Sequence, residues 1–407
     1  TNIIAVLTAI IITIGMRMMG ALLISSLIIF PTVTSMRFCK SFRSVIFSSA
    51  AISVFCFISG LLLSVKYETP TGASVVCFNI FLFAVFSIIK SLNTEKFRAN
   101  VFVRKALSVS LTILFAAVYI FVMLSGGFEL SEKNGTVSVV TTGFAQYDFA
   151  CNIIGKKGEV SMLLSPGEES HTFEPTPADI LKISECDVFI YGGGESEAWV
   201  DSVLESIDSD INIVKMMDIV TLCKEEHDDH ADNHVHSHEE EYDEHVWTSP
   251  LNAIKITKSI CDALVESDPV NADFYKMKTE NYVEELQKLD DSFSEVVQNS
   301  ENSLIVIGDR FPLRYLTERY GIEYLSAFPG CSAQVEANPA TIASMIDIVI
   351  TENIPVVFKV DLGTGKVAET VSESTDAEIR TLYSCHVISS DDFKKGESYI
   401  SLMKRNL

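Results

Sequence analysis

The sequence predicts an α-helical membrane segment followed by an α/β domain of two lobes, which one long rigid helix joins. Three observations predict this architecture: a split in charge near residue 125, uncharged apolar runs before the split, and alternating strand-like and helix-like stretches after it. Residues 1–125 carry ten Lys/Arg and two Asp/Glu, about +8, whereas the remainder carries 21 and 52, about −31. All eight histidines lie in the acidic remainder.

The first part is predicted to lie in a membrane. Its apolar runs are 2–16, 18–35, 44–65, 74–89 and 106–126. Because a crossing takes about 20 residues, the longer runs can span the bilayer, and the shorter ones fit a bundle of short or broken helices. Pro31 is expected to end or kink its helix. The alternative is a buried soluble core, which a mean hydropathy of +0.27 for the whole acidic chain disfavours.

Two basic clusters predict the orientation of these runs. Arg37, Lys40 and Arg43 form one cluster, and the five basic residues from Lys90 to Lys105 form the other. The positive-inside rule places both loops in the cytoplasm. The run 106–126 then leads the chain outward, so the acidic domain is extracytoplasmic. We therefore expect a multi-pass protein of the cell membrane.

A family resemblance appears in residues 16–31, which read MRMMGALLISSLIIFP. This stretch resembles the permease subunit of ABC transporters for zinc and manganese, in which an arginine and a glycine precede an apolar run that ends in proline. The resemblance covers residues 1–92 and implies the C-terminal half of such a permease. Residues 93–130 are then a basic cytoplasmic loop and a transmembrane anchor. The start at Thr1, directly on an apolar run, is expected of a truncated gene product.

The acidic part, residues 131–407, alternates strands with helices. The predicted strands are 137–142, 186–191, 304–308 and 355–358, and predicted helices include 252–266 and 340–353. Such alternation favours parallel sheets. Residues 269–300 contain good helix formers and no Gly or Pro after Pro269, so they predict one rigid helix. It joins a first lobe, about 136–268, to a second lobe, about 302–407.

Two motifs in this part carry a second resemblance. Residues 171–179 read HTFEPTPAD and residues 243–250 read DEHVWTSP. They resemble the two ligand loops of the metal-binding solute receptors of the same transporters, which implies that His171 and His245 bind metal. Zinc-specific members carry a histidine-rich acidic insertion between these loops, as this chain does. The resemblance therefore implies Zn²⁺ as the transported ligand, with Mn²⁺ as the alternative.

The chain departs from that family at the remaining ligands. The family commonly has a third ligand histidine where this chain has Gly308, and Val360 stands where one subgroup has glutamate. His386 falls close to a ligand aspartate of another subgroup, so we take it as the third candidate. Asp309 is the fourth candidate, although it could instead cap a helix that starts near Phe311. Weaker candidates, besides a bound water, are Glu174 and Cys385.

The histidine-rich insertion is predicted to bind metal weakly. It contains five histidines within twelve residues among many carboxylates, which are His227, His230, His234, His236 and His238. Such charge density cannot form a buried core, and without fixed geometry the segment should bind several ions weakly. It would then concentrate metal beside the tight site. The alternative is a merely solvated acidic loop.

These features together predict high-affinity zinc capture outside the membrane and delivery to a permease, with no catalysis in this chain. The motif G-x-x-x-x-G-K-[ST] is absent, so the ATPase is expected on a separate subunit. The motif H-E-x-x-H is absent too, which disfavours a zinc hydrolase. The expected partners are that ATPase, the chain's own permease segment with a second copy, and the membrane; the acidity excludes nucleic acid. A metal sensor or adhesin with a degenerate permease remains the alternative.

Overall fold

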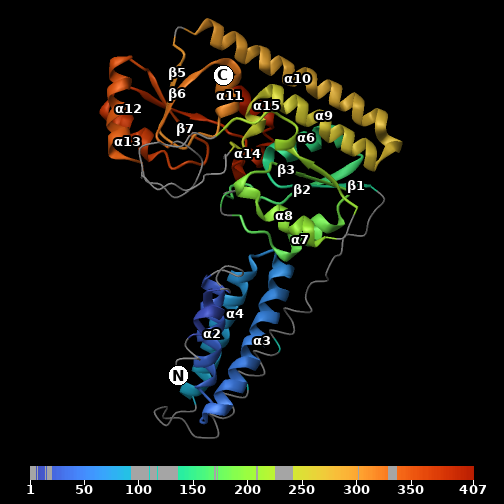
Figure 1. Cartoon of the computed structure of the whole chain (residues 1–407), viewed down its shortest axis with the longest axis vertical. Coiled ribbons are helices and arrows are strands. Elements are labelled where there is room, and N and C mark those ends of the chain that lie inside the picture. The colour runs from blue at the N-terminus through green and yellow to red at the C-terminus, as the bar shows by residue number, and fades with distance from the viewer. Residues whose placement is uncertain are drawn as a thin grey trace. The chain divides into compact units, whose positions relative to one another are not determined.

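The computed structural model places most of the chain, which Figure 1 shows whole. The described residues are 6, 8–13, 15, 21–92, 110, 117, 136–168, 171, 173–207, 210–224, 242–300, 302–328 and 337–407. They form two compact units, Thr1–Asn134 with Glu174–Leu181 and Gly135–Phe173 with Lys182–Leu407. Two expectations lie outside the described residues apart from isolated positions: the loop and anchor of 93–130, and the histidine-rich insertion. The first apolar run is described in part, and its residues 8–13 are helical.

Three helices make up residues 21–92: α2 (Ala21–Ser35), α3 (Phe42–Tyr67) and α4 (Thr71–Leu92). By length and composition, α3 and α4 are long and apolar enough to cross a membrane, whereas α2 is shorter. A Cβ atom at Gly60 would lie 2.5 Å from the Cα atom of Val75. Glycine at this position therefore lets α3 and α4 approach closely, as helices do in membranes.

Helix α2 runs through Pro31 and ends four residues later, at Ser35. We expected the proline to end or kink the helix, since it has no N–H to give to the carbonyl of Leu27. The hydroxyl of Ser53 in α3 lies 3.4 Å from that carbonyl oxygen and donates to it. A neighbouring helix therefore supplies the hydrogen bond that the proline cannot make.

The first lobe of the second unit contains a parallel sheet in the order β2 (Gly158–Met162), β1 (Val137–Thr141), β3 (Val188–Tyr191) and β4 (Asn212–Lys215). Helices α6 (Phe144–Ile154) and α9 (Pro250–Ser267) pack against these strands, and α8 (Trp199–Ser206) lies on another side (Figure 1). Every residue of β3 is buried, which explains its unbroken apolar sequence. Helix α7 (Pro177–Glu185) precedes β3 in the chain.

The second lobe repeats this plan with the parallel order β6 (Glu323–Ser326), β5 (Leu304–Ile307), β7 (Val356–Val360) and β8 (Glu378–Leu382). Its helices are α11 (Arg314–Tyr320), α12 (Pro339–Thr351) and α13 (Lys366–Ser374). A separate apolar cluster, which includes Val306, Met345, Val357 and Val371, forms its core. The predicted α/β class, with two lobes of parallel strands, is confirmed.

The predicted long helix is α10 (Ala272–Asn299), which a short turn at Pro269–Asn271 precedes. Its buried side chains recur every three or four residues, from Tyr275 through Tyr282 and Leu286 to Phe293. This apolar stripe packs on α9 and α6. The helix is therefore fixed along the first lobe and is not a free spacer.

After β8 the chain returns to the first lobe. Helix α14 (Ser390–Lys395) and helix α15 (Tyr399–Arg405) end the chain, and α15 packs on α10 and α6. The backbone N–H of Phe144 donates to the carbonyl of His386 at 3.3 Å. The sequence assigned this C-terminal segment to the second lobe by its position in the chain. Its contacts instead attach His386 to the first lobe.

Candidate metal centre

Three histidines and one glutamate converge in the second unit: His171, Glu244, His245 and His386. One ligand atom of each can be chosen so that all four atoms lie within 4.8 Å of one another. The ring centre of His386 lies 5.0 Å from that of His245 and 5.8 Å from that of His171. The structure thus brings three predicted site residues together and adds Glu244, which the sequence motif contained but which we did not single out.

His245 is oriented by the residue two places before it. One oxygen of Asp243 lies 3.1 Å from Nδ1 of His245 and accepts the backbone N–H of the same residue at 2.8 Å. The Tyr315 hydroxyl donates to the Asp243 carbonyl at 2.7 Å, which holds this turn in place. The imidazole is buried, with 2% of the side chain exposed. A carboxylate at Nδ1 keeps the proton there and leaves Nε2 with its lone pair for a metal.

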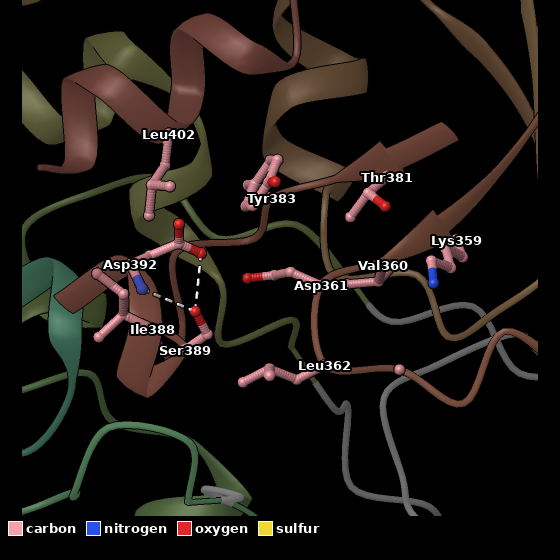
Figure 2. A pocket seen from close by; sticks show the side chains of 11 residues that line it. Lys359, Val360, Asp361, Leu362, Thr381, Tyr383, Ile388, Ser389, Asp392 and Leu402 are labelled. Carbon is pink, nitrogen blue, oxygen red and sulfur yellow. Dashed lines mark hydrogen bonds between the residues drawn. The ribbon is translucent and has the colours of Figure 1, made fainter. Parts of the chain in front are cut away.

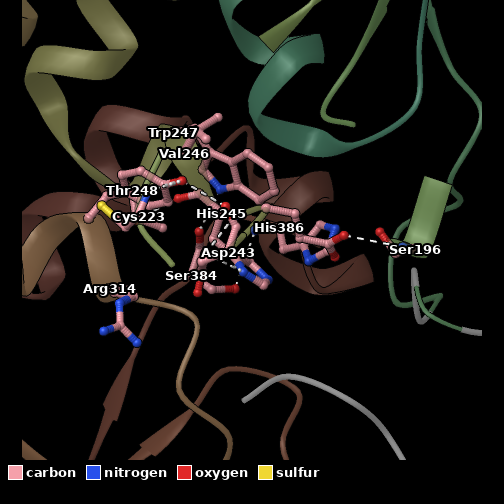
Figure 3. A network of polar contacts seen from close by, with 12 residues as sticks. Ser196, Cys223, Asp243, His245, Val246, Trp247, Thr248, Arg314, Ser384 and His386 are labelled. Carbon is pink, nitrogen blue, oxygen red and sulfur yellow. Dashed lines mark hydrogen bonds and ion pairs between the residues drawn. The ribbon is translucent and has the colours of Figure 1, made fainter. Parts of the chain in front are cut away.

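His386 is held by Trp247, as Figure 3 shows. The indole Nε1 donates to the carbonyl of Ser384 at 2.9 Å, and the Trp247 and His386 ring centres lie 5.0 Å apart. The Tyr399 hydroxyl donates to the Trp247 carbonyl at 2.7 Å. Burial, helped by the neighbouring His245 and His171, lowers the pKa of His386 well below its usual value. The imidazole is therefore neutral near pH 7, which is the form that binds metal.

Glu244 has one satisfied and one unsatisfied carboxylate oxygen. Oε2 accepts the backbone N–H of Ser196 at 3.2 Å. Oε1 is buried and accepts no hydrogen bond from the residues that the structure describes, and it lies 3.9 Å from Nδ1 of His171. A buried carboxylate oxygen without a donor is costly, so its position beside three imidazoles fits a cation better than it fits an empty site.

Asp309 follows β5 and lines the same cavity as the three histidines, a space of roughly 690 Å³. Its Oδ1 accepts the N–H of Arg310 at 3.0 Å, whereas its Oδ2 is buried with no hydrogen bond to any described residue. It does not cap a helix, since α11 begins only at Arg314. Asp309 is not a member of the four-residue group.

The position before Asp309 explains the departure from the family pattern. A Cβ atom at Gly308 would lie 2.3 Å from the backbone nitrogen of Ala368. No side chain fits there unless α13 moves, so a histidine could not occupy this position in the present packing.

The two weaker candidates also lie outside the group. The side chain of Glu174 is exposed. Cys385 is fully buried and has a φ angle of +56°. Burial, then the nearby Asp361, raises the pKa of its thiol well above the usual value, so the thiol stays protonated and is a poor ligand. The five histidines of the insertion lie outside the described residues.

A smaller cavity of about 180 Å³ adjoins the end of β7, and Figure 2 shows Asp361, Tyr383 and Asp392 pointing into it. Asp361 accepts the backbone N–H of Ser384 at 2.8 Å, and burial raises its pKa to about 6. The hydroxyl of Ser389 donates to Asp392 at 2.8 Å. None of the three clustered histidines lines this cavity, so it is distinct from the candidate metal centre.

Two family models match the chain, and together they cover most of it. Residues 139–407 match the family described as zinc-uptake complex component A, periplasmic. Residues 1–90 match the ABC 3 transport family.

Individual relatives match the second part of the chain. It is 30% identical over 281 residues to the high-affinity zinc uptake system protein ZnuA of Bacillus subtilis (strain 168), covering 68% of this chain and 87% of that protein. It is 29% identical over 280 residues to the zinc-binding lipoprotein AdcA of Streptococcus pneumoniae, covering 68% of this chain and 55% of the relative. The chain therefore spans about half the length of AdcA.

Solved structures show the same fold. The Zn(II)-bound ZnuA-like domain of Streptococcus pneumoniae AdcA superposes with a TM-score of 0.56 at 26% identity, covering 67% of this chain and 96% of that one. The metal-dependent lipoprotein YcdH of Bacillus subtilis superposes with a TM-score of 0.57 at 29% identity and the same coverage.

Proposed function

Since this chain belongs to the zinc-uptake complex component A family, we propose that it captures Zn²⁺ outside the membrane and delivers it to an ABC permease for uptake. The observation that carries this proposal is the convergence of three imidazoles and a carboxylate at one point. Zinc is the cargo here, not a resident cofactor. Both matching families are transporter components rather than enzymes, so no reaction is assigned to this chain.

The donor set fits zinc. Zn²⁺ prefers four N, S or O ligands in a tetrahedron, and the group offers three imidazole nitrogens and at least one carboxylate oxygen. Imidazole suits Zn²⁺ better than it suits Mn²⁺, which prefers oxygen ligands. We therefore assign His171, His245 and His386 as nitrogen ligands. Two carboxylates, Glu244 and Asp309, compete for the fourth place.

Delivery would begin within the chain itself. Residues 1–90 belong to a permease-type segment, so the receptor and part of a permease share one polypeptide. If the run 106–126 remains as a spanning helix, the tether raises the effective concentration of one part beside the other, and weak docking suffices. The proposed assembly is a multi-pass membrane protein with its receptor outside, completed by a second permease copy and a separate ATPase.

Zinc uptake into membrane vesicles tests this proposal. Vesicles would contain the chain, its expected ATPase and ATP, with radioactive zinc on the receptor side. We expect ATP-dependent accumulation, lost in His245→Ala and retained when excess Mn²⁺ is added. Tight binding without any transport would favour the metal sensor or adhesin, and competition by Mn²⁺ at equal concentration would favour a manganese receptor.

A further inference from the structure

We infer that Glu244 supplies the fourth ligand, and that the glycine loop after β3 positions it for this task. The inference rests on the proposed function, since it concerns the same metal. The loop, which we call the glycine cradle, comprises Gly192–Gly194 and continues into the short turn Glu195–Glu197. Within the cradle, Gly194 and the backbone of Ser196 are the positioning groups.

Gly194 makes room for the Glu244 carboxylate in two ways. Its φ of 91° and ψ of −173° lie in a region that only glycine adopts readily. A Cβ atom on this residue would lie 2.5 Å from Oε2 of Glu244 and 2.7 Å from its Cβ. Both the backbone shape and the missing side chain are therefore needed where Glu244 lies.

The cradle also determines which oxygen of Glu244 remains available to a metal, because it binds the other one. The N–H of Ser196 donates to Oε2, while Oε1 stays buried with no hydrogen bond within the described part of the chain. The cradle itself is held in place, because Gly193 donates its N–H to Glu197 at 2.8 Å and Gly192 accepts the N–H of Met217 at 3.0 Å. One oxygen is thus fixed by the backbone, and the other lies 3.9 Å from Nδ1 of His171.

Asp309 resembles Glu244 in its buried oxygen and in a glycine packed against it, but it lies farther from the three histidines. It too has a buried oxygen without a hydrogen bond, and a Cβ atom at Gly363 would lie 1.9 Å from that oxygen. Among the carboxylates of the described residues, however, only Glu244 has an oxygen within 4.8 Å of chosen nitrogens on all three histidines. Glu244 can therefore complete the shell with a smaller shift than Asp309, which lies outside the four-residue group.

This assignment takes all four ligands from the first lobe and the C-terminal segment packed on it. Glu244 and His245 are consecutive in the first lobe, and the His386 carbonyl accepts the N–H of Phe144 in the same lobe. No ligand then comes from the sheet of the second lobe. Binding would not require the second lobe to contribute a side chain.

Metal titrations of the full chain in detergent test the inference. All variants would carry alanine at the five insertion histidines, which removes weak binding from the signal. Zinc affinity is measured by competition with a chromophoric chelator, and the ligand geometry is followed by the visible absorption of bound Co²⁺. The variants are Glu244→Gln, Gly194→Ala, the double variant, and Asp309→Asn, which tests the competing carboxylate.

We expect Glu244→Gln to weaken zinc binding at least about tenfold and to change the Co²⁺ spectrum. Gly194→Ala should do the same, and the double variant should be no worse than Glu244→Gln, because Gly194 acts through Glu244. Asp309→Asn should leave both readouts within about twofold. If Gly194→Ala does not fold, as judged by the fluorescence of Trp199 and Trp247, Glu244→Gln alone decides.

The failures of the two proposals are distinguishable. If the starting protein binds no zinc tightly, the proposed function itself is wrong. If it binds one zinc tightly, and Glu244→Gln changes neither affinity nor spectrum, the role of Glu244 is wrong while zinc capture stands. A loss caused by Asp309→Asn would overturn the assignment in favour of the second lobe.

Discussion

The two lobes of the second unit share one topology but differ in what they offer to a metal. Each has four parallel strands in the same relative order, and each presents polar residues beyond the carboxyl ends of its strands, where α/β sheets commonly bind ligands. The clustered histidines and Glu244 are all attached to the first lobe, whereas the second presents Asp309 and Asp361. Two lobes with the same topology therefore need not contribute equal numbers of metal ligands.

The largest effect is expected from His386→Ala, which tests whether the C-terminal segment serves the first lobe. Removing one of three imidazoles should weaken zinc binding by at least about a hundredfold, more than the loss of an outer-shell partner. Chelator competition measures it. Val387→Ala, beside the histidine but carrying no ligand atom, is the control and should bind as the parent does. Equal affinity of His386→Ala and the parent would remove this segment from the site.

The second comparison between the lobes concerns how the free energy of unfolding depends on pH. Burial raises the pKa of Asp148 in the first lobe, and of Asp361 at the end of β7, to about 6. Between about pH 4 and 6 the folded protein keeps a proton that the unfolded chain has lost, so stability falls as pH rises through this window. Each acid accounts for roughly 2 to 3 kcal/mol.

Substitution separates the two contributions. Asp148→Asn and Asp361→Asn should each remove part of the pH dependence of stability. Thermal unfolding followed by tryptophan fluorescence measures this, and the signal reports the first lobe because both tryptophans lie there. If Asp361→Asn had no effect on this signal, the two lobes would unfold independently. A stability that rose from pH 4 to 6 in the parent and in both variants would contradict the assigned pKa shifts.

Trp247→Phe should have a smaller effect on zinc affinity. A smaller aromatic ring remains, but the Nε1 donor to the Ser384 carbonyl is lost. Loss of such an orienting partner typically costs about ten- to a hundredfold in metal affinity, and we expect the low end because the ring still packs on His386. Trp199→Phe is the matched control. An unchanged affinity in Trp247→Phe would show that His386 is held by other contacts.

The smallest effect on the tight site is expected from deleting residues 225–241. Lys224 and Tyr242 pair as an antiparallel bridge, so the two ends of the deleted segment already lie side by side. Calorimetry should show the tight zinc equivalent unchanged and the weak ones gone. Loss of the tight equivalent would mean that the insertion supplies primary ligands.

Local pattern predicted much of this molecule. Apolar runs and strand-helix alternation predicted α3, α4, two strands of each sheet (β1 and β3, β5 and β7) and α10, because these elements follow from periodicity. The return of residues 386–407 to the first lobe was missed, since no local signal shows where a segment packs after its strand ends. Glu244 was missed because acidic residues surround it; its place directly before a ligand histidine was the only available signal. The continuation of α2 beyond Pro31 was missed because the compensating hydroxyl, Ser53, lies in another helix.

A crystal structure of the zinc-loaded chain, with anomalous data at the zinc edge, tests the central claim most directly. The account predicts one strong anomalous peak bound by His171, His245, His386 and Oε1 of Glu244, at about 2.0–2.2 Å from each ligand atom. Asp309 should stay outside the shell. A peak bound by Asp309, or one that lacks His386, would contradict the claim that the first lobe and the segment packed on it hold the metal.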